Sequence, residues 1–469
     1  MPGEIWSHGA LELAEGIRNG RWTSRQVVQA HLDRIGEVNG HLNAIVKVLS
    51  AAALEAADRA DAAVAAGEPL GVFHGVPFTI KENIDVEGQP TTNGIPAMAD
   101  AIAPTTAPAV ERMLAAGAIP IGRTNLPDMG LRIHTDSTLY GRTKNPWHPE
   151  RTAGGSSGGE ASALASGMSP IGLGNDIGGS LRNPAHACGV ASIKPTRGVV
   201  PDTQTYPSPD RALSSQVMLN QGVMARRVAD VRAGLQVVAG YDPRDPVSVQ
   251  ASLTDLAPGE KLTVAVLAEP PGGSTHPGVA AAVRRAADAL AAEGHTVVEA
   301  TPPDYETTFL LWSAMLFDEL HDIRPMIEAV MGEGGKSVIS GALDRFPKMS
   351  SLETYLMHGQ RDGVARRWGQ WFTQHQVLLT PTWTQPAFVA DYDISSEEGS
   401  TGTLELMRPV LPGNLLGLPC AVVPAGLADG LPVGVQIIGD RFTDLRVLAV
   451  AQQVEDALGV LTPIEPVRG

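Results

Sequence analysis

Two glycine-rich segments carry serines whose hydroxyl groups could act as nucleophiles. The first is GGSSGG at residues 154–159, and the second, GLGNDIGGS, ends at Ser180. Glycines at positions 178 and 179 allow successive backbone N–H groups to converge on one point, which the stabilisation of an oxyanion requires. From the second segment alone, a catalytic turn and a purely structural turn are equally supported.

The first segment has two other interpretations. It contains the pattern G-x-S-x-G, centred on Ser156 or equally on Ser157, which is the nucleophile elbow of α/β-hydrolases. That elbow must follow a buried strand, and the preceding residues, WHPERTA, have no strand character. A flexible Gly/Ser linker is the plainer alternative, but the segment leads directly into a small-residue helix pattern.

A serine nucleophile needs a base, and Lys81 is a better candidate than any of the twelve histidines. It ends the run VPFTIK, in which no other charged residue occurs. Such a strand is typical of the buried interior of a sheet, so its amine would be partly desolvated. Burial lowers the pKa of a lysine, and a base at neutral pH requires this. A lysine that reaches solvent from a strand end is an equally supported alternative.

The elements around these motifs alternate between helices and short apolar strands, which predicts an α/β layer architecture. The predicted helices lie at 10–38 (two helices), 50–66, 106–117, 159–167, 277–292 and 443–457. The predicted strands lie at 42–48, 75–81, 118–121, 262–267, 296–299, 377–380 and 421–424, the last followed by a hairpin through 428–430. No internal repeat or long linker interrupts this order, so we expect one domain over residues 1–469.

Residues 305–375 are predicted to be mostly helical and carry a concentration of large aromatic side chains, among them Phe309, Trp312, Phe317, Tyr355, Trp368, Trp371 and Phe372. Together with Trp383, these rings could form an apolar wall beside a substrate. Ordinary core packing is the better-supported alternative for each ring taken singly. The acidic, small-residue stretch at 395–403 is predicted to be a mobile loop, and the sequence leaves open whether it gates a pocket.

The composition excludes several classes of function. A net charge of −16 disfavours binding to nucleic acid or to an anionic membrane. Only Cys188 and Cys420 are present, far apart, so neither a disulfide scaffold nor a structural zinc site is indicated. No secretory signal and no apolar run of membrane-spanning length are visible, and the expected location is the cytoplasm.

Several segments, in one order along the chain, resemble the amidase signature family. They are GVPFTIKENIDVEG at 75–88, GRTNLPD at 122–128, GRTKNPW at 141–147, GGSSGG at 154–159, GLGNDIGGSLRNPA at 172–185, CGVASIKPTRG at 188–198, LTPT at 379–382 and GLPVGVQIIG at 430–439. The resemblance covers about residues 10–457, with the core motifs within 75–200. It implies an α/β fold with a central mixed, mostly parallel β-sheet that is covered by helices on both faces.

In that family a Ser–cis-Ser–Lys triad hydrolyses amides and related acyl bonds. By motif position, the resemblance implies Ser180 as the nucleophile, Ser156 as the bridging serine after a cis peptide bond, and Lys81 as the base. It also implies that the oxyanion is held by the N–H groups of Ile177, Gly178, Gly179 and Ser180. Gly155, Ser157, Asp176 and Arg182 match family positions that support the turn. No metal and no organic cofactor is implied.

Two departures from the family pattern bear on the substrate. Asn175 stands where the family commonly has Thr, and the segment from Gly130, expected to line the acyl pocket, is atypical. Gly130 and Asn175, together with Trp383 from the predicted aromatic wall, are the predicted substrate-contacting residues. The expected substrates are small linear amides with hydrophobic or aromatic groups, including anilides, carbamates (a urethanase activity) or esters. An amidotransferase-type, glutaminase-like subunit of a complex and a non-catalytic binding protein are the alternatives. We expect a monomer or a homodimer.

Overall fold

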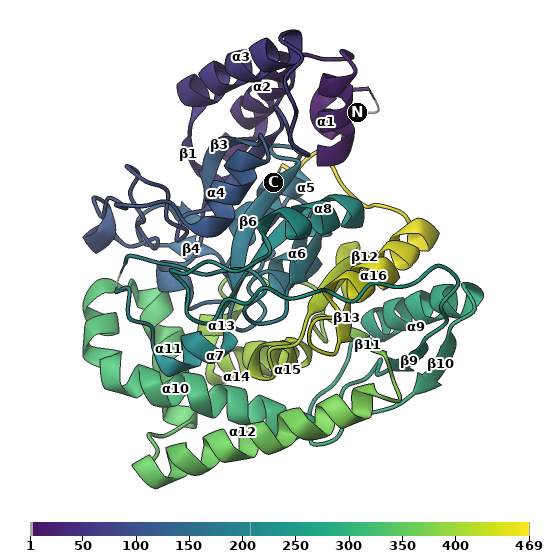
Figure 1. Ribbon diagram of the computed structural model, residues 1–469. Coiled ribbons are helices and arrows are strands. Elements are labelled where there is room, and N and C mark those ends of the chain that lie inside the picture. The colour runs from purple at the N-terminus through teal and green to yellow at the C-terminus, as the bar shows by residue number, and fades with distance from the viewer. Residues whose placement is uncertain (1–2, 207, 469) are drawn as a thin grey trace.

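Short runs of aliphatic and β-branched residues form one eleven-stranded sheet, in the order β1-β3-β2-β6-β8-β7-β12-β13-β11-β9-β10 (Figure 1). The computed structural model describes residues 3–206 and 208–468. The strands of this sheet are β1 (Ile45–Val48), β2 (Pro77–Lys81), β3 (Ile119–Thr124), β6 (Ile171–Asp176), β7 (Ala191–Lys194), β8 (Asn220–Ala225), β9 (Thr263–Val266), β10 (Thr296–Glu299), β11 (Val377–Pro381), β12 (Cys420–Ala428) and β13 (Leu431–Gly439). A separate two-stranded sheet contains β4 (Asp136–Ser137) and β5 (Gly141–Arg142).

The helices follow the strands closely along the chain. They are α1 (Ala10–Arg18), α2 (Ser24–Leu42), α3 (Ser50–Ala65), α4 (Pro108–Ala115), α5 (Gly158–Ala165), α6 (Arg182–Cys188), α7 (Leu213–Met218), α8 (Val228–Val238), α9 (Pro277–Ala292), α10 (Tyr305–Val330), α11 (Glu333–Arg345), α12 (Ser351–Phe372), α13 (Tyr392–Ser395), α14 (Glu397–Leu406), α15 (Leu411–Leu415) and α16 (Asp444–Leu458). Short 3₁₀ turns lie at Ile5–Ser7, Pro96–Met98, Asp128–Gly130 and Arg408–Val410. Within the described ranges, no helix combines the length and the apolar character needed to cross a membrane.

The α/β fold with a mixed sheet agrees with the prediction, but the sheet is not mostly parallel. Parallel pairing occurs at its two sides, between β2 and each of β3 and β6, and between β9 and each of β10 and β11. The pairs in the centre are antiparallel. The reason lies in the connections: α4 and α9 provide the crossovers that parallel neighbours need, whereas the tight Asp429-Gly430 turn between β12 and β13 permits only antiparallel pairing.

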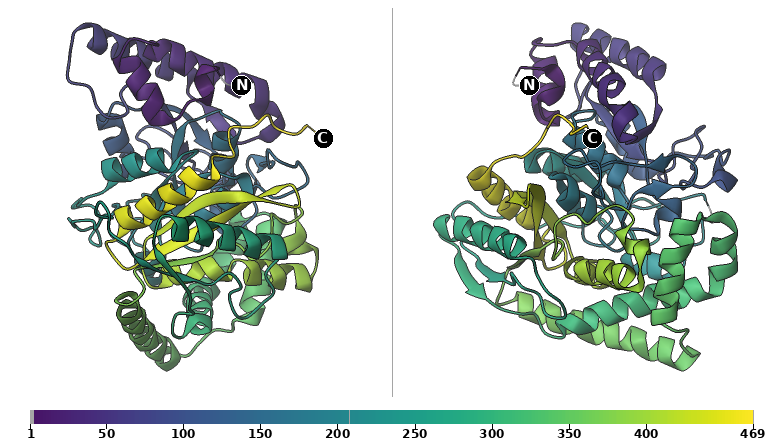
Figure 2. Two further views of the ribbon diagram at one scale, coloured as in Figure 1. Left: turned by 90° about the vertical axis from the view of Figure 1, so that its right-hand side faces the viewer. Right: turned by 180° about the vertical axis from the view of Figure 1, so that it is seen from behind.

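Side chains alternate between the two faces of the sheet and enter two separate apolar cores. Leu379 and Ile437, which are paired across β11 and β13, pack with side chains of α9 and α16. Their neighbours Leu378 and Ile438 pack on the other face with side chains of α10. Figure 2 shows α9 and α16 side by side on the first face. Helices therefore cover both faces, as predicted.

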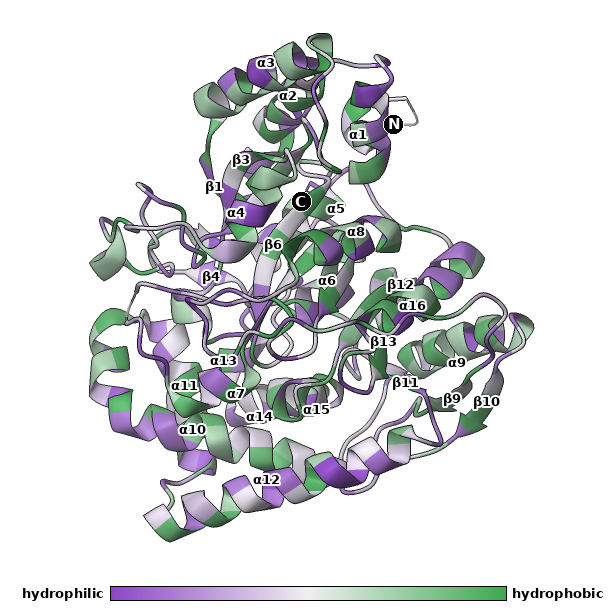
Figure 3. Ribbon diagram, viewed as in Figure 1, coloured by the Kyte–Doolittle hydropathy of each residue, from purple (hydrophilic) through white to green (hydrophobic). Residues whose placement is uncertain are grey.

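The long helices α10 and α12 lie at one end of the molecule, and α1 to α3 lie at the opposite end (Figures 1 and 2). In Figure 3, α12 carries both hydrophilic and hydrophobic segments, as expected of a helix with one side in solvent. Its Trp368 is fully buried, whereas Tyr355 is 75% exposed. The predicted helical character of 305–375 is therefore confirmed.

Two local predictions were wrong. Residues 395–403 are not a loop, because most of them belong to α14, which starts where the side chain of Ser396 accepts a hydrogen bond from the N–H of Gly399. The first part of the predicted turn at 172–180 is the buried strand β6. Gly172 serves close approach in that strand, since a Cβ there would lie 1.9 Å from Oε1 of Glu160.

Helix α5 packs closely against the segment after β3 at Gly159, and this contact should contribute to the stability of the fold. A Cβ at Gly159 would lie 2.4 Å from the backbone nitrogen of Asn125, so Gly159→Ala is expected to destabilise the fold by about 1–3 kcal/mol and to lower the melting temperature. At Gly369 in α12, no heavy atom of the described residues lies within 4 Å of the added Cβ. Gly369→Ala is therefore the matched control, and it should leave the melting temperature unchanged or raise it slightly. A Gly159→Ala protein that melts like the wild type would contradict this packing.

Candidate active site

Lys81 is the last residue of β2 and has no exposed surface. β2 is an interior strand between β3 and β6, and helices α2 and α5 pack against it, so the side chain of Lys81 has no path to solvent. Its Nζ lies 2.7 Å from Oγ of Ser156 and 2.7 Å from Oδ1 of Asn175. The amine is therefore held between a hydroxyl and an amide oxygen.

The protonation of Lys81 depends on burial and on two carboxylates. Burial lowers the pKa of Lys81 to about 7, and the charges of Asp176 and Glu160 oppose that shift. Glu160 is itself fully buried, and it accepts hydrogen bonds from Thr79 Oγ1 at 2.5 Å and from Thr124 Oγ1 at 2.9 Å. Burial raises the pKa of Glu160 to about 7. Near neutral pH, a substantial fraction of Lys81 is therefore the free amine, which can accept a proton.

Ser156 follows a cis peptide bond from Gly155, as the family resemblance implied. A Cβ at Gly155 would lie 2.5 Å from the carbonyl oxygen of Arg132, so only glycine fits there. The next residue, Ser157, is the N-cap residue of α5, and its N–H donates to the carbonyl oxygen of Ser180 at 3.2 Å. This hydrogen bond joins the two glycine-rich segments, which are distant in the sequence.

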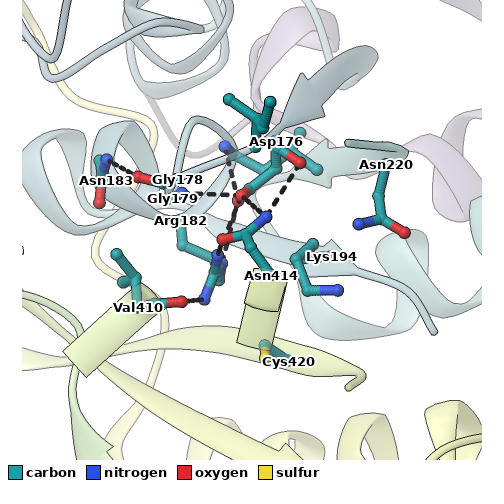
Figure 4. Close-up of polar contacts among 12 residues, drawn as sticks. Asp176, Gly178, Gly179, Arg182, Asn183, Lys194, Asn220, Val410, Asn414 and Cys420 are labelled. Atoms are coloured by element: carbon teal, nitrogen blue, oxygen red, sulfur yellow. Dashed lines mark hydrogen bonds and ion pairs between the residues drawn. The ribbon is translucent and has the colours of Figure 1, made fainter. Parts of the chain in front are cut away.

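The turn after β6 is held by Asp176. Its carboxylate accepts hydrogen bonds from the N–H groups of Gly179 at 2.7 Å and Leu181 at 3.1 Å, and from Nε and Nη2 of Arg182 at 2.9 Å each. Asn414 donates to the same carboxylate at 2.8 Å (Figure 4). Although burial opposes it, the guanidinium of Arg182 holds the pKa of Asp176 well below its usual range. Asp176 and Arg182 thus hold the shape of the turn between β6 and α6.

One of the four predicted oxyanion donors is already engaged. The N–H of Gly179 donates to Oδ1 of Asp176, so it is not directed at a ligand. The other three predicted donors belong to Ile177, Gly178 and Ser180, and all three residues line the neighbouring cavity, whereas Gly179 does not. The set of candidate donors is therefore reduced to three.

Trp312 of α10 orients the peptide group between Ile177 and Gly178. Its Nε1 donates to the carbonyl oxygen of Ile177 at 2.8 Å. In a trans peptide the N–H points opposite to the C=O, so this bond also fixes the direction of the Gly178 N–H. A Cβ at Gly178 would lie 2.4 Å from Cζ2 of Trp312, which explains the glycine.

Trp383 lies behind the turn and not in the cavity. It is fully buried, and its Nε1 donates to Oδ1 of Asn183 at 2.8 Å. The Nδ2 of Asn183 in turn donates to the carbonyl oxygens of Gly178 at 3.1 Å and Gly155 at 3.3 Å. The position predicted for Trp383, against the substrate, is therefore corrected: the ring helps to hold both glycine-rich segments.

A cavity of about 610 Å³ opens beside Ser180. Its apolar wall includes the side chains of Trp312, Leu316, Phe317, Ile339, Leu404 and Met407. The helix that replaces the predicted loop, α14, contributes to this wall, so residues 395–403 are part of the cavity. Charged side chains such as Asp344 and Glu397 also line it.

The other predicted residues are divided between the cavity and its surroundings. Gly130 lines the cavity, and a Cβ there would lie 3.3 Å from Oγ of Ser156. Within the described ranges the wall does not include Asn175, whose side chain contacts Lys81 instead. Of the predicted aromatic wall, Trp312 and Phe317 reach the cavity. Trp368 packs in the core against Tyr305, 6.3 Å between ring centroids.

Sequence reasoning missed Asn83 and Glu160. Asn83 accepts a hydrogen bond from Nδ2 of Asn175 at 2.9 Å, and Glu160 on α5 is one of the two carboxylates whose charges raise the pKa of Lys81. Each had a sequence signal. Asn83 follows Lys81 by two residues in a motif already identified, and Glu160 is the one charged residue in the small-residue helix pattern at 159–167.

Other nucleophiles and metal ligands are poorly placed. Burial raises the pKa of the Cys188 and Cys420 thiols, which disfavours their reactive thiolate forms. Burial also lowers the pKa of His134 and His186 to about 4 each. In the part of the chain that the structure describes, no group of three or more His, Cys, Asp or Glu side chains could hold a metal ion.

Comparison with known proteins identifies the family to which this fold belongs. A family model described as "Amidase" matches residues 26–448, and the chain belongs to this family of amide hydrolases. It is 42% identical to an indoleacetamide hydrolase of Bradyrhizobium diazoefficiens over 98% of this chain and 88% of the relative. It is also 32% identical to a glutamyl-tRNA(Gln) amidotransferase subunit of Salinispora arenicola, over 98% and 99% of the two chains. The crystal structure of a bacterial aryl acylamidase of the amidase signature family superposes with a TM-score of 0.83, at 26% identity over 97% of each chain.

The buried ion pair between Asp176 and Arg182 is expected to stabilise the turn that carries Ser180. Asp176→Asn leaves Arg182 without a counter-charge, and breaking such a buried pair typically costs about 3–5 kcal/mol. We expect a lower melting temperature and a large loss of amide hydrolysis, because the turn loses its shape. The control is Asp255→Asn, which breaks the more exposed pair with Arg232 and should cost about 0–1 kcal/mol without loss of activity. Equal melting temperatures for the two variants would contradict the role of Asp176.

Proposed function

We propose that this protein hydrolyses linear amides through an acyl-enzyme on Ser180, with Ser156 as the bridging group and Lys81 as the base. The observation that carries the proposal is the 2.7 Å contact between the buried amine of Lys81 and Oγ of Ser156. An amine with a pKa of about 7 is half unprotonated near neutral pH, which general-base catalysis requires. The same cavity that holds Ser180 provides three candidate oxyanion donors.

In the proposed mechanism, a proton moves from Ser180 to Ser156 and from Ser156 to the free amine of Lys81. Oγ of Ser180 attacks the carbonyl carbon, and the N–H groups of Ile177, Gly178 and Ser180 stabilise the resulting oxyanion. The proton then returns through Ser156 to the leaving nitrogen, and the C–N bond breaks. Water enters, loses a proton to the same relay and hydrolyses the ester.

The proposed substrates are amides with an aromatic acyl group. Support comes from the apolar wall, on which Phe317 and Trp312 meet at 6.1 Å between ring centroids in an edge-to-face arrangement. A cavity of about 610 Å³ has the size that a substrate with one or two fused rings needs. The similarity to an indoleacetamide hydrolase agrees with an arylacetamide substrate. Anilides, aryl carbamates and aryl esters carry a ring on the leaving group and not on the acyl group, and they are the secondary candidates.

A second candidate function is that of an amidotransferase subunit, and the 32% identity to such subunits supports it. Glutamine has no aromatic group to pack on Leu316, Phe317 and Met407, so the apolar part of the wall gives this substrate no advantage over an arylacetamide. Hydrolysis of arylacetamides by the purified chain alone would favour the free-standing amidase. Activity on glutamine only, and only with partner subunits, would favour the alternative.

The triad assignment predicts a graded loss of activity and a defined pH dependence. Ser180→Ala and Lys81→Ala should each lower kcat/KM by about 10³-fold or more, and Ser156→Ala should have a smaller effect because water can replace part of the relay. In the wild type, kcat/KM should fall as the pH drops below about 7, because protonation removes the lone pair of Lys81. Rates measured from pH 5 to 9 by ammonia release test both points.

The exposed Lys261 provides the control for these variants. Its amine contacts the carbonyl oxygen of Glu293 at the surface, so Lys261→Ala should keep the wild-type rate and pH profile. Full activity in Lys81→Ala would show that the lysine is not the base. Labelling of a residue other than Ser180 by a fluorophosphonate would show that Ser180 is not the nucleophile.

The aromatic preference predicts that Phe317→Leu raises KM for phenylacetamide and indole-3-acetamide by about 10-fold, because an edge-to-face ring contact and apolar area are lost. KM for propionamide, which cannot reach that wall, should change little. Trp371→Leu is the control, since Trp371 packs on Phe372 and His375 away from the cavity. A wild-type protein that prefers short aliphatic amides would refute the aromatic assignment.

A further inference from the structure

We propose that Asn175 and Asn83 act as a pair of positioning residues that direct the amine of Lys81 toward Ser156. This inference rests on the proposed function of Lys81 as the base of the hydrolase. Asn175 was expected to contact the substrate, but its side chain reaches Lys81 in the interior of the sheet.

The three side chains form a continuous row of hydrogen bonds. Nζ of Lys81 donates to Oδ1 of Asn175 at 2.7 Å, and Nδ2 of Asn175 donates to Oδ1 of Asn83 at 2.9 Å. Asn83 lies two residues beyond Lys81, and Asn175 is in the neighbouring strand β6. The row therefore starts at the amine of Lys81 at the end of β2, passes through the amide of Asn175 on β6 and ends at Asn83.

The donor and acceptor groups of the three side chains determine the direction of these hydrogen bonds. The ammonium form of Lys81 has only N–H donors, so a group that stabilises it must present an acceptor. The carbonyl oxygen of Asn175 faces Lys81, and its NH₂ group must then point to an acceptor on the other side, which Asn83 provides. Without Asn83, the Asn175 amide could rotate and place a donor against the amine.

When one N–H group of the amine is bonded to Asn175, the lone pair of the nitrogen is free to face Ser156. In the described ranges, the hydrogen bonds of Nζ go to Oδ1 of Asn175 and to Oγ of Ser156. When the free amine donates one N–H to Asn175, its lone pair can face the Ser156 hydroxyl and accept a proton. After the transfer, the bond to Asn175 becomes charge-assisted and stabilises the ammonium ion.

The charged groups near Lys81 are otherwise held by other partners. Asp176 on β6 is paired with Arg182 of α6, and Glu160 on α5 is bonded to Thr79 and Thr124. Glu82, which follows Lys81 directly after the end of β2, is paired with Arg123 of β3 at 3.3 Å. Asp176 and Glu160 act on the amine through their charges, whereas Asn175 is bonded to it directly.

Asparagine suits this position for a geometric reason. Its carbonyl oxygen lies one bond further from the backbone than the hydroxyl of the Thr that the family commonly has there. The asparagine amide also has an NH₂ donor in the same plane as its carbonyl oxygen, so the donor and the acceptor have fixed directions relative to each other. The hydrogen of a threonine hydroxyl rotates and has no such fixed direction. The Asn83–Asn175 pair is thus a specific way of fixing the lysine in this chain.

The test measures the activation of Ser180 without any amide. A fluorophosphonate reacts with an activated serine: Oγ of Ser180 bonds to phosphorus, fluoride leaves, and the proton passes through Ser156 to Lys81. Asn175→Leu, which is similar in shape, should lower the maximal labelling rate about 10-fold and move the acid limb of its pH profile down by about one pH unit, because the ammonium form has lost an acceptor. Asn175→Asp should move the acid limb up by about one unit, because a carboxylate stabilises the ammonium ion.

Two further variants separate positioning from folding. Asn83→Leu leaves residue 175 intact, and it should lower the labelling rate and shift the acid limb in the same direction as Asn175→Leu, by less. Asn145→Leu removes a buried amide that bonds the carbonyl oxygens of Thr152 and Ala187 and does not touch Lys81. It should lower the melting temperature and leave the acid limb where it is in the wild type.

Acid limbs of Asn175→Leu and Asn175→Asp that coincide with that of the wild type would overturn the inference, even if both variants react slowly. Wild-type protein that is labelled at Ser180 but hydrolyses no amide would refute the proposed function alone, and the shifts would still decide the role of Asn175. A wild-type protein that is not labelled at all would overturn both.

Discussion

The amine of Lys81 is enclosed by the sheet, and this burial is the constraint on which the surrounding structure depends. An ammonium ion that has lost its hydration is unfavourable, which lowers the pKa of the lysine. Asp176 and Glu160 limit this effect, and each is kept in place by its own hydrogen bonds. The balance leaves the amine near the midpoint of its titration at neutral pH. A more exposed lysine would remain charged, and a lysine without the two carboxylates would be a weaker base.

The glycines of the site make this burial possible. Residues 152–176 are buried without exception, so neither glycine-rich segment is a flexible linker. The space that a Cβ would occupy at Gly172 is filled by the carboxyl group of Glu160, and at Gly178 it is filled by the indole of Trp312. Small residues thus allow β2, β6 and α5 to approach closely, and the larger side chains that fill the gaps are those that tune or orient the reactive groups.

Much of the fold could be predicted from local patterns. The helix at 277–292 and the strand at 296–299 agree with α9 and β10, because amphipathic period and β-branched composition are local properties. The strand β6 was not recognised, because GLGND has neither alternation nor β-branched residues. Its strand conformation comes from pairing with β2 and β8 on its two sides. The acidic residues of 395–403 similarly became helical through a cap and through packing at the cavity.

The sequence by itself determined which groups could react: a lysine after an uncharged strand, two serines in glycine-rich segments, and an acidic residue with an arginine beside the second serine. It did not determine which polar atoms meet. Residues 81 and 156 are 75 positions apart and residues 81 and 175 are 94 apart, so their contacts depend on the order of the strands in the sheet. Only the tertiary structure decided that Asn175 faces the lysine, that the N–H of Gly179 is engaged by Asp176, and that Trp383 lies behind the turn. Local patterns specify the conformation of a segment, whereas the direction of a buried hydrogen bond is decided by which partner the neighbouring strand or helix presents.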